Sequence, residues 1–91
     1  MNQYEVEFIA ACPNNGQRIK YQLCIKYVHG WIPVEAIASL VADIQSGYHE
    51  DIAETLREAF GGMQTLTADR HGVRITTHRT GEARKFTVRQ Q

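Results

Sequence analysis

The chain has few of the residues on which disulfide-rich and metal-bound small domains depend. Among its 91 residues are two cysteines and four histidines, and no histidine stands three or four positions from another histidine or from a cysteine. Zinc sites in small domains use such closely spaced ligand pairs. We therefore expect neither a metal site nor a bound cofactor.

Long apolar runs and targeting signals are also missing. No apolar segment approaches the ~20 residues that a helix needs to cross a bilayer. The N-terminus, Met-Asn-Gln-Tyr-Glu, has no basic patch followed by an apolar stretch, which a secretory signal would require. These absences predict a protein without membrane contact, and the cytoplasm is the expected compartment.

The common catalytic motifs are absent as well. The sequence has no glycine-rich phosphate loop, no Ser/His/Asp set and no paired-carboxylate spacing. Its densest polar cluster is Asp69-Arg70-His71, and an aspartate in such a segment commonly hydrogen-bonds its own backbone in a turn. We assign no catalytic residue and favour a non-enzymatic protein.

What the chain does have is strict alternation near its start. Apolar and polar residues alternate over 4–8 and 19–27, and the sequence Pro-Asn-Asn-Gly lies between these runs at 13–16. Alternation with period two predicts a β-hairpin with one apolar face. The inward residues are Tyr4, Val6, Phe8, Ala10 and Cys12 on the first strand and Ile19, Tyr21, Leu23, Ile25 and Tyr27 on the second.

Two loop lengths keep apolar residues opposite each other in this hairpin. A two-residue Asn-Gly turn, the best short sequence for positive φ at both positions, would set Glu5 opposite Lys26. A four-residue loop over residues 13–16 would instead set Glu5 opposite Cys24. The alternation itself does not choose between the two registers.

The two cysteines fall on different faces of this hairpin. Cys12 belongs to the inward set of its strand and Cys24 to the outward set of the next. A disulfide between them would need the backbone to move, because the two Cβ atoms point to opposite sides of the sheet. We expect both thiols to be free.

The middle of the chain has helical periodicity. Apolar residues recur at three- and four-residue spacing from Pro33 to Phe60. One helix of that length would measure ~42 Å, about twice the length of a six-residue strand. Gly47 lies near its centre, so two helices separated at Gly47 are predicted, each with an apolar face against the hairpin.

Alternation returns after Met63. Strands are predicted over residues 64–68, 73–79 and 85–89, with turns at 69–72 and 80–83. The first of these turns would set Leu66 opposite Ile75. The whole chain, residues 1–91, is thus predicted to form one α+β domain of order ββααβββ, an antiparallel sheet with two helices packed on one face.

The net charge is zero, but it is unevenly distributed. Residues 1–60 carry four basic and eight acidic side chains, a net charge of −4, whereas residues 61–91 carry six basic and two acidic ones, a net charge of +4. The last predicted hairpin gathers most of this positive charge. We expect an anion- or partner-binding face formed by Arg74, His78, Arg79, Arg84, Lys85 and Arg89.

An acidic protein surface is the expected partner of this basic hairpin. Nucleic acid, bound through Arg74, His78, Lys85 and Arg89, has less support, because no aromatic residue interleaves with those charges and the domain has no net positive charge. The simplest alternative is a solvated face without a partner, whose like charges are screened by salt.

Three aromatic residues, Trp31, Tyr27 and Tyr48, form a second candidate contact surface. Trp and Tyr are among the residues most enriched in binding hot spots. The plainer interpretation is that Trp31, in a loop before a helix, covers the end of the core.

The order of hairpin, helix pair and hairpin resembles that of the tunnelling-fold enzymes of pterin and deazapurine metabolism. The likeness is one of element order, and the zinc histidines and the purine-anchoring carboxylate of that family match no residues of this sequence. The resemblance implies an oligomer whose ligand pocket forms between subunits.

Three hypotheses of function follow. The first is a small non-enzymatic binding or regulatory protein, for example an inhibitor, that acts through protein contacts and can form a homodimer. The second is a subunit of an oligomeric tunnelling-fold-like enzyme or small-molecule binder with an inter-subunit pocket. The third is a nucleic-acid-binding module.

Overall fold

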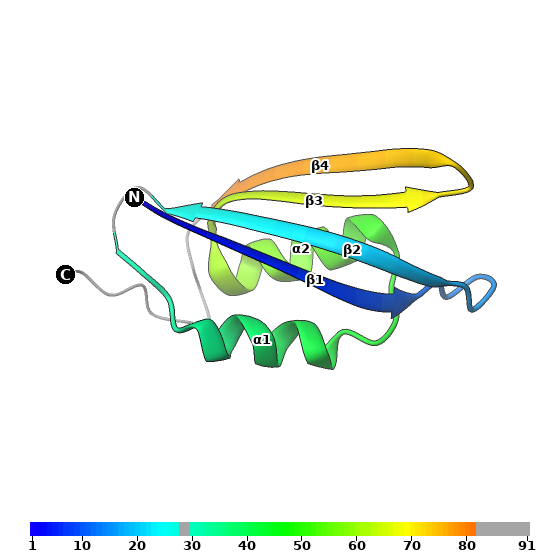
Figure 1. Ribbon diagram of the computed structural model, residues 1–91, viewed down its shortest axis with the longest axis horizontal. Coiled ribbons are helices and arrows are strands. Elements are labelled where there is room, and N and C mark those ends of the chain that lie inside the picture. The colour runs from blue at the N-terminus through cyan, green and yellow to red at the C-terminus, as the bar shows by residue number, and fades with distance from the viewer. Residues whose placement is uncertain (28–29, 82–91) are drawn as a thin grey trace.

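The computed structural model describes residues 1–27 and 30–81 of the chain. Its elements are β1 (Asn2–Ala11), β2 (Arg18–Tyr27), α1 (Val34–Asp43), α2 (His49–Phe60), β3 (Gly62–Arg70) and β4 (Val73–Gly81). The strands form one antiparallel sheet in the order β1-β2-β3-β4. Both helices lie on the same face of the sheet, α1 beside β1 and α2 beside β3 and β4 (Figure 1).

The predicted α+β class is confirmed, with an antiparallel sheet and two helices on one face. The alternation and the helical spacing predicted these elements in the order in which the chain makes them. The fifth strand, predicted over residues 85–89, lies outside the described residues, as does the second half of the turn predicted at 80–83.

The apolar face of the first hairpin is the centre of the core. Leu23 and Ile25 of β2 are fully buried, and Phe8 of β1 is almost so. From the helix side, Leu56 and Phe60 of α2 pack into the same cluster. The helices therefore cover the face that the alternation predicted, and the opposite face of the sheet is left without them.

The first hairpin adopts the register of the four-residue loop. Glu5 stands opposite Cys24, and the pairing of the strands continues to the end of the hairpin. The Cys12 N–H donates to the Gln17 carbonyl over 2.8 Å, and the Gly16 N–H donates to the Cys12 carbonyl over 2.7 Å. These two bonds close a loop over residues 13–16, so the two-residue Asn-Gly turn does not form.

The register of the second hairpin differs by two residues from the predicted one. His71 and Gly72 both have positive φ, 51° and 78°, as a two-residue hairpin turn requires. The strands therefore extend to Arg70 and Val73, and Leu66 stands opposite Thr77 rather than Ile75. The prediction of a four-residue turn was wrong because a histidine can adopt the left-handed conformation next to a glycine, which allows a turn of two residues.

The two helices are separated at Gly47, as predicted: α1 ends at Asp43 and α2 begins at His49. The linker between them is attached to the end of β1, because the Ala11 N–H donates to the Gln45 carbonyl and the Gly47 N–H donates to the Ala11 carbonyl, over 2.9 and 3.1 Å. The loop of the first hairpin, this linker and the turn between β3 and β4 lie at the same end of the molecule (Figure 1).

The C-terminal end of α2 is closed by side chains of the sheet. The buried Gln64 amide donates to the carbonyls of Leu56 and Gly61, over 2.9 and 2.7 Å. The Tyr27 hydroxyl donates to the Phe60 carbonyl. The last four carbonyls of a helix have no partner within it, so the bond to Phe60 satisfies one of them, and the Gln64 amide binds two further carbonyls on either side of the helix end.

Alkaline pH should destabilise the fold through Tyr27. Burial, together with the nearby Tyr4, raises the pKa of Tyr27 from 10.0 to about 12. A raised pKa in the folded state stabilises the fold below the unfolded value, and this contribution is lost as pH rises from about 10 through about 12. We expect a loss of roughly 2–3 kcal/mol in the free energy of unfolding over that window.

Urea titrations at several pH values measure this effect, with Tyr27→Phe as the control. The variant should be less stable at neutral pH, because the Phe60 carbonyl loses its donor, and its stability should decline less steeply above pH 10. An equally steep decline in the variant would contradict the assignment to Tyr27.

Candidate functional site: the open face of the sheet

The face of the sheet away from the helices is polar. Its outward side chains on β3 and β4 include several threonines, two of which, Thr67 and Thr76, stand directly opposite each other. Beside them, the Thr65 hydroxyl lies 3.2 Å from Nδ1 of His78. Neither described helix covers this surface, which we call the open face (Figure 1).

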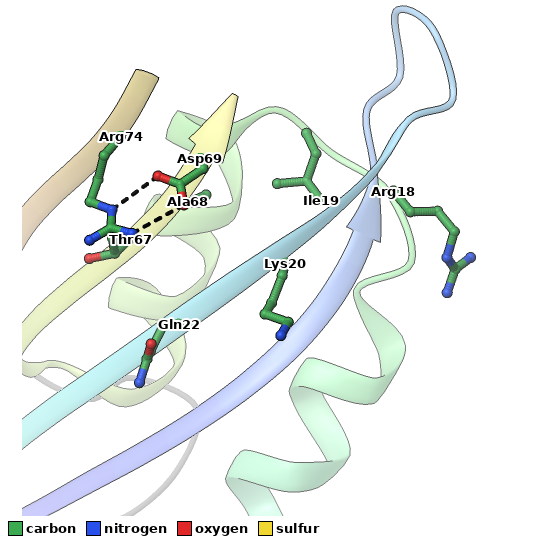
Figure 2. Close-up of a pocket in the computed structure, with 8 residues that line it drawn as sticks. All are labelled: Arg18, Ile19, Lys20, Gln22, Thr67, Ala68, Asp69 and Arg74. Atoms are coloured by element: carbon green, nitrogen blue, oxygen red, sulfur yellow. Dashed lines mark hydrogen bonds and ion pairs between the residues drawn. The ribbon is translucent and has the colours of Figure 1, made fainter. Parts of the chain in front are cut away.

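Strands β2 and β3 separate at one end of the open face. Their pairing runs from Lys26 and Met63 to Tyr21 and Ala68 and then stops, although both strands continue. A pocket of about 470 Å³ lies at this separation (Figure 2). Its lining residues are Arg18, Ile19, Lys20, Gln22, Thr67, Ala68, Asp69 and Arg74.

The charges around this pocket are mostly positive. Asp69 is the acidic residue of the lining, and Arg74 engages both of its oxygens, over 3.0 and 3.2 Å. These bonds hold the pKa of Asp69 below its ordinary value. Within residues 1–27 and 30–81, neither Arg18 nor Lys20 forms an ion pair. Two cations of the pocket are thus available to a ligand.

The structure brings together only part of the predicted basic face. Arg74 and His78 lie on the open face, as expected for that face of the hairpin. Arg79 points to the helix side, where it pairs with Glu50 over 2.6 Å and with Glu54 over 3.7 Å. The predicted residues Arg84, Lys85 and Arg89 lie outside the described residues.

Sequence reasoning missed the contribution of β2 to this surface. Alternation already placed Lys20 and Gln22 on the outward side of their strand. It did not predict that β2 would pair with β3, which sets these side chains near Arg74. The sequence showed that Lys20 and Gln22 point outward, but only the strand order shows that they lie beside Arg74.

The three aromatic residues of the second candidate surface are not assembled. Tyr27 is buried in the core, and its hydroxyl binds at the C-terminal end of α2. Tyr48 is half exposed and precedes the first residue of that helix. The helix has 12 residues, so its two ends lie about 18 Å apart. Trp31 is half-buried.

The described residues include no group that could hold a metal ion, since no three histidine, cysteine, aspartate or glutamate side chains converge there. Cys12 and Cys24 are both free thiols. Across the same residues, every helix is too short or too polar to span a membrane.

The fold and this surface define a small α+β domain whose antiparallel sheet has one face packed on two helices and one face open. No protein-family model matches the chain, and no curated protein and no solved structure shows significant similarity to it.

Proposed function

We propose that the protein is a non-enzymatic binding protein that recognises an acidic protein surface through the open face of its sheet. The observation that supports this proposal is the pocket between β2 and β3, where Arg18 and Lys20 have no acidic partner among the described residues. A regulatory or inhibitory role would follow from occupying the partner's own binding surface.

Charge complementarity is the physical reason for preferring an acidic partner. A positive patch that meets carboxylates accelerates encounter and rejects basic surfaces, even where its contribution to affinity is small. Asp69 holds Arg74 across the pocket, and a carboxylate of the partner can compete for the same guanidinium. Lys20 and Arg74 are thus the basic side chains that an acidic surface can engage here, whereas the Arg18 side chain points away from Arg74 (Figure 2).

A protein partner fits this surface better than nucleic acid does. Proteins that bind single strands combine a positive groove with aromatic side chains on which bases stack. Among residues 1–27 and 30–81, no aromatic side chain lines the pocket between β2 and β3. The net charge of the chain is also zero, whereas nucleic-acid-binding domains are commonly basic.

Capture from a native lysate with matched charge-reversal variants tests the proposal. Lys20→Glu reverses a charge at the pocket, and Lys26→Glu makes the same change on the same strand and face, about 20 Å away. We expect a protein with an acidic surface to be retained by the wild type and by Lys26→Glu and to be lost from Lys20→Glu. Equal retention by Lys20→Glu would contradict the proposal.

A further inference from the structure

A second polar cluster lies on the helix side of the sheet, beneath the end where β2 and β3 separate. It consists of Cys12, Tyr21, His49 and Arg70, contributed by the first hairpin, the start of α2 and the end of β3. Tyr21 is 0% exposed and His49 is 4% exposed. Their ring centres are 5.7 Å apart, so the two side chains pack against each other.

Five buried polar atoms of this cluster have no hydrogen-bond partner of normal geometry in the part of the chain that the structure describes. The Tyr21 hydroxyl, both ring nitrogens of His49, and Nε and Nη2 of Arg70 are buried without one. Arg70 acts on both Tyr21 and Cys12 through its charge and through weak hydrogen bonding, yet the Tyr21 hydroxyl and Nε and Nη2 of Arg70 have no partner at normal hydrogen-bond distance and angle. Buried polar groups are normally paired, and exceptions often mark the place of a ligand, ion or water.

The cluster is rich in hydrogen-bond donors and has no anionic partner among the described residues. A guanidinium offers a planar fork of N–H donors, a phenol offers an O–H, and a neutral imidazole offers one N–H. The backbone N–H groups of Asn14 and Asn15, with a smaller contribution from Arg70, lower the pKa of the Cys12 thiol against the opposing effect of burial. No carboxylate pairs with Arg70 in the described residues.

We propose that this cluster is a binding site for a small oxyanion, a phosphate or a carboxylate group, held by Arg70, Tyr21 and His49. The site lies on the opposite side of the sheet from the pocket that contains Lys20 and Arg74, so it is separate from the proposed protein-binding surface. The lost pairing beyond Tyr21 and Ala68 leaves Arg70 without a strand partner on the β2 side.

The pKa of His49 should change when an anion binds. Burial lowers the pKa of its imidazole, and the charges around it are those of Glu50, Arg70 and Arg79. Tyr21 and Cys12 complete its titratable surroundings. An added negative charge favours the imidazolium, so a bound oxyanion should raise the pKa of His49.

Titration with inorganic phosphate, followed by the NMR signals of the His49 ring and by thermal unfolding, tests the proposal. We expect saturable shifts at His49, a rise of its pKa and a phosphate-dependent rise of Tm. Arg70→Gln and Tyr21→Phe should each weaken phosphate binding about tenfold or more. Lys26→Gln, which removes an exposed cation of β2 that lines neither site, should leave binding unchanged.

Acetate in place of phosphate distinguishes the two sources of oxyanion, and whichever binds more tightly identifies the group. Tyr21→Phe also separates binding from folding, because it should keep or raise the Tm without phosphate and lose the rise that phosphate produces. The proposal would be overturned if neither anion gave a saturable response, or if Tyr21→Phe and Arg70→Gln bound phosphate as the wild type does.

Discussion

Replacing Leu23 with alanine should lower the free energy of unfolding by about 2–5 kcal/mol. Leu23 is fully buried at the centre of β2, where it lies between Val6 on β1 and Leu66 on β3. Its truncation removes apolar contacts and leaves a cavity beneath a sheet that has no second apolar layer. Small domains have free energies of unfolding of roughly 5–15 kcal/mol, so this loss is a large fraction of the total stability.

Urea denaturation followed by circular dichroism measures this change, and Ile9→Ala is the matched control. Ile9 lies on the outward side of β1 and is 48% exposed, so its truncation should cost less than about 1 kcal/mol. Similar losses in the two variants would mean that the inward and outward faces are not as different as the structure requires.

The second large effect is expected at Gln64. Replacing this buried residue with leucine should lower the free energy of unfolding by about 2–4 kcal/mol, because the buried carbonyls of Leu56 and Gly61 would each lose a hydrogen bond from the Gln64 amide. Leucine has a similar size and is more apolar, so a loss of stability would arise from the hydrogen bonds and not from packing.

Gln22→Leu provides the comparison for this variant. Gln22 is an exposed residue of the neighbouring strand, and the same exchange there should change the stability by no more than about 0.5 kcal/mol. Unchanged or increased stability of Gln64→Leu in denaturant would show that water or another donor satisfies these carbonyls.

Much of the fold could be predicted because it depends on local periodicity. The alternation around Phe8 and Leu23 fixes which side chains point inward, since a shift by one residue would expose them all. The helical spacing and Gly47 likewise predicted two helices in place of one. These signals lie within single elements and need no knowledge of their neighbours.

Features that depend on how elements meet could not be predicted in the same way. The register of the second hairpin depends on His71 adopting positive φ, which its residue type permits but does not require. That register places Arg79 against the carboxylates of α2 and extends β3 to Arg70. The pocket beside Lys20 exists because β2 and β3 separate, and no local pattern encodes that separation.

The most direct measurement of how the open face functions is a chemical-shift map of the ¹⁵N-labelled protein, recorded while the acidic partner captured from the lysate is added. We expect the largest shifts at the amides of Lys20, Gln22, Thr67 and Asp69, around the pocket between β2 and β3. Shifts confined to the outer surfaces of α1 and α2, with the open face unchanged, would contradict recognition through the sheet.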